Sequence, residues 1–474
     1  MTMTSRSYRH HNEPYAGYFK TEIPTEDAEI TRVLPGTPMG EYMRRFWQPV
    51  CMSEQLTDLP HAIRILGEDL VAFRDRRGKV GLLHRHCCHR GTSLEYGIIQ
   101  ERGIRCCYHG FHFDIDGRIL DVPGETDHGE KLRDTVSQGA YPVLERDGLV
   151  FAYFGPPNEK PKFPEYDGFE KTNDTKLIPF SNVYPCNWLQ IMDNIADQIH
   201  TYILHNTAAL YDGPMPSELD ASKFTLSNAF VTLPVLDYQE VRDRTGMVFI
   251  AGRRVSDDKV WIRINDLIVP NITQHAYLYE DGSKRRLWHR VHMSRWYVPI
   301  DDTNAIIFGW RMFGKNIDPL QLGDESKVGW DKMDFLDGQV GDRSYQEAQR
   351  IPGDWEAVSS QRPIAIHALE NPMSIDSGIY MNRKLIRDAV RGETPMAAPQ
   401  CMHERANAGL PTHCYTNNTI MEIPQKADEE EDRAMIFNLG KSIVAIAAQG
   451  DQYTGRERDA FIIKKIEELE ASFQ

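Results

Sequence analysis

Two short segments in the first quarter of the chain carry side chains that bind metals. The first reads Cys87-Cys88-His89-Arg90-Gly91, and the second reads Cys106-Cys107-Tyr108-His109-Gly110. As ligand spacings these are C-x-H and C-x-x-H, so each segment offers one thiolate and one imidazole. Sixteen residues separate the His of the first segment from the first Cys of the second. Together the segments predict one metal centre with mixed ligands.

Two classes of centre take two Cys and two His. Zinc modules usually supply them as C-x2–4-C and H-x3–5-H pairs, so that each loop offers one ligand type. A Rieske [2Fe–2S] cluster takes two thiolates on one iron and two imidazoles on the other. Here each loop supplies one of each, and Gly91 and Gly110 follow directly, where tight loops need glycine. This interleaved order favours the iron–sulfur cluster over zinc.

The two segments resemble the Rieske family. The family's four cluster ligands fall on matching residue types: Cys87, His89, Cys106 and His109. The chain departs from the family at Cys88 and Cys107, where Pro is usual, so spacing alone selects the ligand within each Cys-Cys pair. Respiratory Rieske proteins carry an extra disulfide at positions that hold Thr92 and Tyr108 here. The resemblance is therefore to the oxygenase and ferredoxin branch.

A second group of metal-binding side chains includes Asp197, His200 and His205. Two His and one carboxylate with open positions form the ligand set of non-haem Fe(II) sites that activate O2. On a helix, Asp197 and His200 would share a face, since they lie about 60° apart. His200 and His205 would lie about 140° apart in a regular α-helix. We therefore predict a π-type or other distortion between the two His residues.

The carboxylate ligand of this second site lies elsewhere in the chain, and the residues alone leave four candidates: Asp337, Asp342, Asp354 and Asp376. Ser374 or Asp376 could instead cap the helix that follows them. The stretch resembles phthalate-dioxygenase-like members, in which an Asp precedes a Pro-Ile pair by about nine residues. A Glu and a helix-starting Asp then follow. Asp354, Pro363-Ile364, Glu370 and Asp376 fit this frame, so the resemblance implies Asp354 as the ligand and Asp376 as the cap. Ser359 departs from it, because those relatives usually have Glu there.

The segment from Asn194 to His205 resembles the Rieske oxygenase pattern Asn-x-x-Asp-x-x-His-x4-His. In that family the Asp bridges a cluster His of one subunit to an iron His of the next. The resemblance implies this role for Asp197, between His109 or His89 of one chain and His200 or His205 of its neighbour. It also implies a head-to-tail trimer, or a stacked pair of trimers. On the residues alone, Asp197 could also be a helix-surface carboxylate.

The strands and helices predicted around these metal-binding residues divide the chain into two domains. Short strands separated by turns, at 63–66, 70–74, 80–83 and 149–154, predict a small all-β domain over 45–158. A Pro-rich linker follows, and residues 165–474 mix strands at 247–251, 296–299 and 306–310 with helices near 379–390 and 462–469. The acidic run 429–432 reads as a solvated loop. Residues 1–44 are expected to form an N-terminal segment that packs on the catalytic domain. Residues 35–40 and 44–50 resemble the segment that precedes the Rieske domain in phthalate-dioxygenase-like members.

The fold class expected is α+β: an N-terminal all-β Rieske domain, then a catalytic domain. The resemblance implies that the latter is helix-grip-like, an antiparallel sheet with helices around a mononuclear iron. Residues from about 391 are expected to form a C-terminal extension of this domain that the resemblance does not cover.

Composition sets limits on partners and location. The 474 residues carry a net charge of −15, which argues against nucleic acid and is compatible with a basic redox partner. No apolar run reaches 18 residues, and the polar start has no signal-peptide core. We therefore expect no membrane span and a cytoplasmic location. The eight Cys are sparse and half of them lie in the two clusters, so no disulfide framework is expected.

The resemblance implies the terminal oxygenase of a multicomponent system, with NAD(P)H-derived electrons arriving through a reductase, with or without a ferredoxin. It also implies an aromatic carboxylate as substrate. O-demethylation of a methoxylated acid, as in dehydrodivanillate O-demethylases, is favoured, with cis-dihydroxylation as the alternative. Arg263, Arg290 and Arg295 are candidate carboxylate partners. A Rieske electron carrier would hold only the cluster, whereas an oxygenase also holds a mononuclear iron. A binding protein stabilised by zinc at the two Cys-His segments would be colourless, whereas a Rieske protein is red-brown.

Overall fold

The computed structural model describes residues 14–20, 23–169, 174–206 and 227–473. The strands of residues 48–152 form three small antiparallel sheets, in the orders β1-β10-β9, β2-β3-β4 and β5-β6-β7-β8. Their bounds, with the one α-helix among them, are β1 Gln48–Met52, β2 His61–Ile65, β3 Glu68–Arg74, β4 Val80–His84, β5 Ile98–Ile99, β6 Ile104–Arg105, β7 His112–Phe113, β8 Ile119–Asp121, α3 Glu130–Thr135, β9 Val143–Arg146 and β10 Leu149–Ala152. The strands predicted at 63–66, 70–74 and 80–83 are confirmed as the sheet β2-β3-β4.

A single nine-stranded antiparallel sheet forms the centre of the rest of the chain. Its main path runs β11-β18-β17-β15-β14-β13-β12, and β19 joins it by pairing with β14 and β16. The bounds are β11 Lys176–Tyr184, β12 Val235–Val241, β13 Gly246–Ser256, β14 Lys259–Ile268, β15 Ile272–Ala276, β16 Arg286–His289, β17 Val291–Pro299, β18 Ala305–Phe313 and β19 Asn417–Glu422. The three predicted strands of this region are confirmed within β13, β17 and β18.

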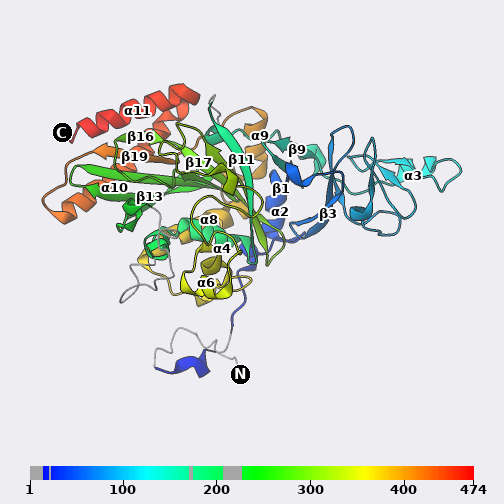
Figure 1. The fold of residues 1–474 in the computed structure, drawn as a ribbon, viewed down its shortest axis with the longest axis horizontal. Coiled ribbons are helices and arrows are strands. Elements are labelled where there is room, and N and C mark those ends of the chain that lie inside the picture. The colour runs from blue at the N-terminus through cyan, green and yellow to red at the C-terminus, as the bar shows by residue number, and fades with distance from the viewer. Residues whose placement is uncertain (1–13, 21–22, 170–173, 207–226, 474) are drawn as a thin grey trace.

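Helices pack on both faces of this sheet (Figure 1). Along β13, Met247 and Phe249 belong to the main core beside α8, whereas Val248 and Ile250 belong to a second core under α10. This alternation follows from the two-residue repeat of a strand. The helix bounds are α1 Ala28–Thr31, α2 Pro38–Arg44, α4 Trp188–Ala196, α5 His200–Ile203, α6 Tyr345–Arg350, α7 Asp354–Ser359, α8 Ser377–Val390, α9 Pro399–Asn407, α10 Glu429–Gln449 and α11 Gly455–Ala471. The predicted helices near 379–390 and 462–469 are confirmed as α8 and α11.

The expectation of a solvated loop at 429–432 was wrong, because these acids form the first turn of α10. The Asp428 side chain caps the helix by accepting a hydrogen bond from the Glu431 N–H at 2.9 Å. Carboxylates in a first turn are favoured by the helix dipole. Asp432 is buried, and its two oxygens accept hydrogen bonds from Arg254 at 2.6 and 3.1 Å. Asp432 therefore anchors α10 on the sheet, whereas the other three acids of the run are exposed.

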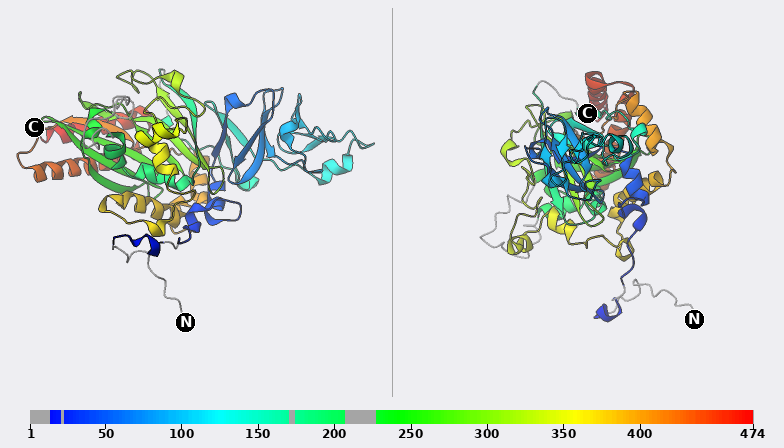
Figure 2. Two further views of the ribbon diagram at one scale, coloured as in Figure 1. Left: turned by 60° about the horizontal axis from the view of Figure 1, so that its bottom comes forward. Right: turned by 90° about the vertical axis from the view of Figure 1, so that its right-hand side faces the viewer.

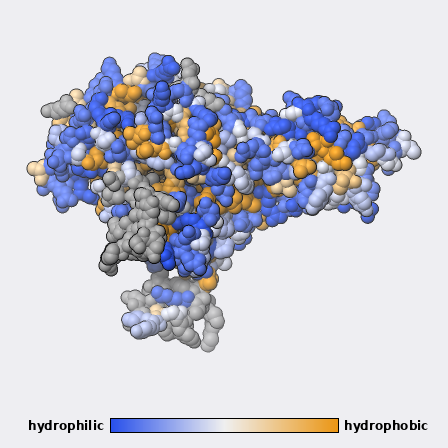
Figure 3. All heavy atoms as spheres, viewed as in Figure 1, coloured by the Kyte–Doolittle hydropathy of each residue, from blue (hydrophilic) through white to orange (hydrophobic). Residues whose placement is uncertain are grey.

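The three small sheets project from one end of the molecule, away from α4, α8 and α10 (Figures 1 and 2). The surface in the view of Figure 3 is mostly hydrophilic, with apolar side chains gathered in limited patches. Within the described residues, no helix is both long enough and apolar enough to cross a membrane.

Part of the N-terminal segment 1–44 lies outside the described residues. Residues 27–33 of this segment contact α8 and the turn after β17. Arg387 on α8 forms ion pairs with Asp27 and Glu29, and the Val33 N–H donates to Asp302 at 2.8 Å. The domain limits at 45–158 and 165–474 stay predictions.

Candidate metal centres

A break between α4 and α5 positions the first histidine of the predicted iron site. Helix α4 ends at Ala196, and the Asp197 carboxylate accepts a hydrogen bond from the Ile199 N–H at 3.0 Å, as an Asx turn does. Helix α5 then begins at His200. Asp197 and His200 therefore do not share one helix, and the expectation of a common helical face was wrong.

The step from His200 to His205 is a change of helix type. Residues 200–203 are α-helical and residues 204–206 form a 3₁₀ turn. The helical path is thus distorted, as predicted, but it tightens where a π-turn would widen it, so the π-type form of the prediction was wrong. The two imidazole rings lie 5.3 Å apart between centroids and are inclined by 72°.

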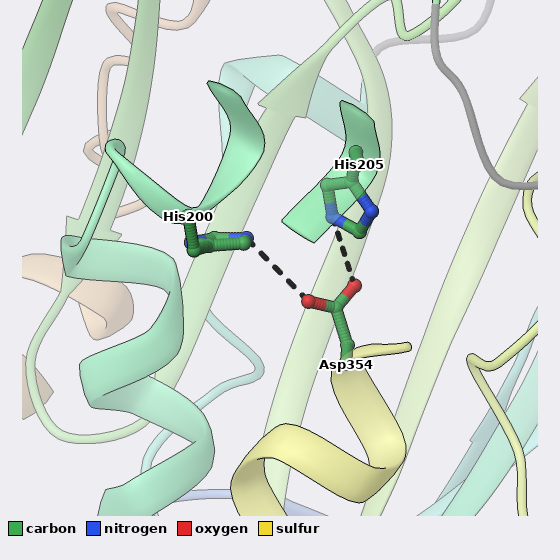
Figure 4. A group of neighbouring side chains, drawn as sticks. All are labelled: His200, His205 and Asp354. Carbon is green, nitrogen blue, oxygen red and sulfur yellow. Dashed lines mark ion pairs between the residues drawn. The ribbon is translucent and has the colours of Figure 1, made fainter. Parts of the chain in front are cut away.

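Asp354, at the start of α7, faces both histidines (Figure 4). Its Oδ1 lies 3.5 Å from His200 Nε2 and its Oδ2 lies 3.4 Å from His205 Nε2. One ligand atom from each of the three side chains lies within 4.8 Å of the others, a grouping that could hold one metal ion. Two imidazoles and one carboxylate with room for further ligands match the donor set of non-haem iron.

Neighbouring polar groups hold the three side chains in place. Asn194 donates to Asp354 Oδ1 at 3.3 Å, and Gln339 donates to Oδ2 at 2.6 Å. Nδ1 of His200 is hydrogen-bonded to the backbone oxygen of Asp197, which leaves Nε2 directed at Asp354. Such outer contacts fix the tautomer and the orientation of metal ligands. Gln339 was not singled out from the sequence, because only the fold brings it to this site.

The local electrostatics favour the protonation states that metal binding needs. Burial raises the pKa of the Asp354 carboxyl, but His205, His200 and the Gln339 hydrogen bond together bring it well below its ordinary value. Burial lowers the pKa of the His200 imidazole, against the opposing attraction of Asp354. A neutral imidazole beside an ionised carboxylate is the form in which these groups ligate a metal.

The other acids considered as ligands lie outside this group. Asp337 and Asp342 are exposed. Asp376 accepts a hydrogen bond from the Met373 N–H at 2.7 Å, which closes the short turn before α8. Asp376 is the N-cap residue of α8, although its side chain makes no cap hydrogen bond to that helix. The assignment of His200, His205 and Asp354 as ligands stays a prediction.

A small cavity of about 60 Å³ opens beside this group. Its apolar wall comes from Ile195, Phe230, Leu278, Met293, Phe335 and Leu336. Its polar wall includes Asn265 and His275, from β14 and β15. His275 Nε2 is 2.8 Å from Thr273 Oγ1, which in turn is 2.9 Å from the Tyr297 hydroxyl. This buried chain was not predicted, since it depends on the pairing of β15 with β17.

Two of the three candidate arginines reach this cavity. Arg263 and Arg295 line it and are buried. Arg263 donates to the backbone oxygens of Tyr277 and Ala276, and burial lowers its pKa to about 9. Within the described part of the chain, neither Arg263 nor Arg295 makes an ion pair. Arg290 does not line the cavity and pairs instead with Asp167 at 3.0 Å.

The two Cys-His segments form loops with the same hydrogen-bond pattern. The N–H of Cys87 donates to Thr92 O at 2.9 Å, and that of Cys106 donates to Phe111 O at 2.8 Å. The Gly91 and Gly110 N–H groups donate back to the respective Cys oxygens, at 2.8 and 3.1 Å. Both glycines have φ near +78°, a conformation that favours glycine. Each of the two similar loops can therefore present one thiolate to one iron of a cluster and one imidazole to the other.

The Cys and His side chains of these loops differ in how deeply they are buried. The thiols of Cys87 and Cys106 are buried, at 4% exposure each, and the His89 and His109 rings lie 4.6 Å apart nearer the surface. The neighbouring Cys88 and Cys107 are exposed. A hydrogen bond with Cys88 raises the pKa of the Cys87 thiol. The donor set fits a Rieske cluster, and the four ligand assignments stay predictions.

Asp197 is half-buried, and within the described residues no hydrogen bond or ion pair joins it to either histidine of the cluster loops. Its bridging role between subunits stays a prediction.

Known proteins are similar to this chain both in the region of the cluster loops and along most of its length. A family model of the Rieske [2Fe-2S] domain matches residues 46–137. The oxygenase subunit of tert-butanol monooxygenase / tert-amyl alcohol desaturase from Aquincola tertiaricarbonis is 48% identical over 466 residues, covering 97% of each chain. The alpha subunit of phenoxybenzoate dioxygenase from Ectopseudomonas oleovorans is 36% identical over 79% of this chain and 88% of its own.

Two further comparisons extend the similarity. The oxygenase subunit of 5,5'-dehydrodivanillate O-demethylase from Sphingobium sp. is 30% identical over 90% of this chain and 96% of its own. The structure of NdmB from Pseudomonas putida CBB5 matches 79% of this chain and 98% of its own, with a TM-score of 0.53 and 16% identity. At that identity the match concerns the fold alone.

Proposed function

The chain belongs to the Rieske non-haem iron oxygenases as an alpha (oxygenase) subunit, and we propose that it oxidises a small branched aliphatic alcohol by hydroxylation or desaturation. As a member of this family the protein is an oxidoreductase that incorporates O2. It is the terminal oxygenase of a multicomponent system, so its electrons come from a separate reductase. Its cofactors are a Rieske [2Fe–2S] cluster and a mononuclear iron.

These cofactors, when bound, supply electron storage and O2 activation, and the chain holds and orients them. We propose that the cluster is held by Cys87, His89, Cys106 and His109. We propose His200, His205 and Asp354 for the iron. Asn194 and Gln339 orient the carboxylate, and the backbone oxygen of Asp197 orients His200.

The single observation that carries the substrate proposal is the 48% identity with the tert-butanol and tert-amyl alcohol enzyme over 97% of both chains. The size of the cavity agrees with it. About 60 Å³ is far below the roughly 300–1,000 Å³ of pockets for drug-sized ligands. Leu278 and Met293 would contact the methyl groups of a tertiary alcohol, while the second amide N–H of Asn265 would donate to its hydroxyl.

A second candidate is the aromatic carboxylate expected from the sequence, oxidised by O-demethylation or by cis-dihydroxylation. Arg263 and Arg295 favour it, because two buried cations without an ion pair among the described residues could bind a carboxylate. The 36% and 30% identities with the phenoxybenzoate and dehydrodivanillate enzymes also support it. The phthalate-dioxygenase-like branch remains the proposed branch for either substrate.

One product assay separates the two candidates. The holoenzyme, with a surrogate reductase and NADH, is given tert-butanol, tert-amyl alcohol, phenoxybenzoate and methoxylated benzoates in separate reactions. Oxidised products from the alcohols alone support the first candidate, and products from the acids alone overturn it. The Asp354→Ala variant serves as the blank, because it should lack the iron while keeping the cluster.

We also propose a head-to-tail trimer, or stacked trimers, with Asp197 between the cluster of one subunit and the iron of the next. The projection of the small sheets away from α4 and α7 supports this, since one chain would hold its two centres apart (Figure 1). Light scattering of the holoenzyme tests it, and a monomer that turns over at the full rate would contradict it.

A further inference from the structure

One buried side chain, Gln138, holds the edge of the chain that leads into the first cluster loop. Its amide Nε2 donates to His84 O at 2.7 Å and to His86 O at 3.0 Å, and its Oε1 accepts from the Cys88 N–H at 2.7 Å. An amide side chain has two N–H donors and a carbonyl acceptor, so the whole polar end of Gln138 is bonded. Gln138 is 3% exposed, which keeps water from competing for these bonds. One side chain thereby fixes the backbone at three alternate residues.

Backbone pairing places Gln138 beside this edge. The His84 N–H donates to Gly139 O at 2.9 Å, and the Gln138 N–H donates to Gly117 O at 2.8 Å. Gly117 has a φ of +84°, and a Cβ there would lie 2.1 Å from Gln138 O. Glycine alone allows both this turn and this close approach. The Gln138 side chain thus continues toward the loop the pairing that the backbone begins at His84.

The backbone hydrogen bonds on the other side of this segment come from the loop itself. The Cys87 N–H donates to Thr92 O at 2.9 Å, whereas the next N–H, that of Cys88, donates to Gln138. Successive residues of an extended segment point to opposite sides. The side chains follow the same division, since Cys87 is buried with 4% exposure and Cys88 is exposed. A shift of one residue would exchange the two Cys, because such a slip moves every side chain to the other side.

Cys88 can make its bond to Gln138 because it is not a proline. The Rieske family usually has Pro at this position, and proline has a fixed φ and no N–H. Cys88 has the N–H but lacks the ring that would fix its backbone. The bond to Gln138 supplies a restraint at the same residue. The amide therefore does for this loop what a proline ring would do.

The second cluster loop is held in a different way. Nη1 of Arg105 donates to Gly110 O at 2.7 Å and to Asp121 Oδ2 at 3.0 Å, so this contact acts at the glycine end of the loop. Among the residues that the structure describes, no side chain forms a hydrogen bond with the backbone of Cys107. The two Cys-Cys pairs therefore differ in how the backbone of the second Cys is restrained.

We propose that Gln138 is a positioning residue that sets the register of the first cluster loop and thereby selects Cys87, and not Cys88, as the cluster ligand. This inference rests on the four cluster ligands proposed above. With the amide in place, the buried thiol and the imidazole two residues later belong to one fixed turn. Without the amide, the backbone at Cys88 can shift by one residue, and either thiol can be presented to the iron.

Gln138→Met tests this role, because methionine has a similar length but forms none of the three hydrogen bonds. In the reduced holoenzyme we expect two EPR signals of the [2Fe–2S] cluster in place of one. The visible absorption of the cluster should also be lost at least about tenfold faster in the presence of a chelator, since each hydrogen bond helps to hold the loop. Gln55→Met is the matched control and should behave as the wild type does. Gln55 accepts from the Met52 N–H at 2.9 Å, at the end of β1.

A second substitution identifies the origin of the extra signal. In the Gln138→Met background, Cys88→Ala should restore a single signal, whereas Cys107→Ala should leave both signals. With Gln138 present, Cys88→Ala should keep the wild-type signal. A single signal from Gln138→Met, or an extra signal that survives Cys88→Ala, would overturn the role of Gln138 and leave Cys87 as the ligand. Loss of the cluster from Cys88→Ala in the presence of Gln138 would instead contradict the proposed ligand set, and this inference with it.

Hydrogen exchange of the wild-type holoenzyme gives a test that needs no variant. The Cys88 residue is exposed, but its N–H is bonded to Gln138. We expect this amide to exchange at least about tenfold more slowly than an unbonded amide, as measured by mass spectrometry at single-residue resolution. Exchange of the Cys88 amide at the rate of an unbonded one would refute the proposal, even if Gln138→Met does not fold.

Discussion

Oδ2 of Asp354 lies 3.4 Å from Nε2 of His205, although α7 and the 3₁₀ turn at 204–206 are distant in the sequence. The same carboxylate reaches His200 with its other oxygen. Both imidazoles present Nε2 to one carboxylate, and a metal ion between them would replace two ion pairs by three coordinate bonds. Asp354 is thus the residue that should decide whether the iron binds.

Asp354→Ala should remove the mononuclear iron and leave the cluster intact. The iron content should fall from about three to about two atoms per chain, with an unchanged [2Fe–2S] absorption spectrum. Asp376→Ala is the matched control, because Asp376 only closes a turn before α8. If Asp354→Ala retained the iron and Asp376→Ala lost it, Asp376 would be the iron ligand in place of Asp354.

Asp197→Asn should slow turnover while both metal centres stay loaded. An amide can still accept the Ile199 hydrogen bond that ends α4, so the local fold should persist. It cannot serve as an anionic acceptor for two imidazole N–H groups, which is the role proposed between subunits. We expect at least about a tenfold slower reoxidation of the reduced cluster by stopped-flow absorption. Full turnover with both metals bound would rule out the bridging role.

Leu278→Ala should enlarge the cavity beside the iron site and change the preference among alcohols. The kcat/KM ratio of tert-amyl alcohol to tert-butanol should rise by about tenfold, the lower range of what one methylene contributes in an apolar pocket. Leu385→Ala, in the core at α8, is the control: it also creates a buried void but does not line the cavity. An equal rise of the ratio in both variants would show that the cavity does not set the preference.

Local patterns account for what could be predicted from the sequence. The cluster loops, the sheet β2-β3-β4 and the apolar stripe of α8 each depend on residues close in the chain. The third ligand, Asp354, was reached only through a family resemblance, since spacing left four acids open. The break at Asp197 was missed because a uniform helix was assumed across an Asx turn. Asp432 was misread because only the fold brings Arg254 to it.

His289 should make folding stability depend on pH. Burial and the Arg286 charge lower the pKa of its imidazole to about 4, from about 6.5 in an unfolded chain. Between these values the unfolded chain binds more protons, so stability rises with pH and is lost as the pH falls below about 6.5. The loss should reach about 2 kcal/mol at pH 5.

The His289→Gln variant isolates this contribution. Glutamine can keep the donor bond to Asn316 O, which His289 makes at 3.0 Å, but it does not titrate. Urea unfolding at pH 7.5 and pH 5.0 should give a smaller difference for the variant than for the wild type. The same difference in both proteins would show that His289 is not the group responsible.

Asp432→Ala should destabilise the fold far more than removal of its exposed neighbour Glu430. Asp432 holds Arg254 through two hydrogen bonds, and only 5% of its side chain is exposed. Removing one partner of a buried pair costs about 3–5 kcal/mol, because the other charge is left without compensation. Glu430→Ala loses only a first-turn charge, worth about 0.3–1 kcal/mol. The free energies of unfolding in urea would measure both, and equal losses would show that the Asp432–Arg254 pair does not anchor α10.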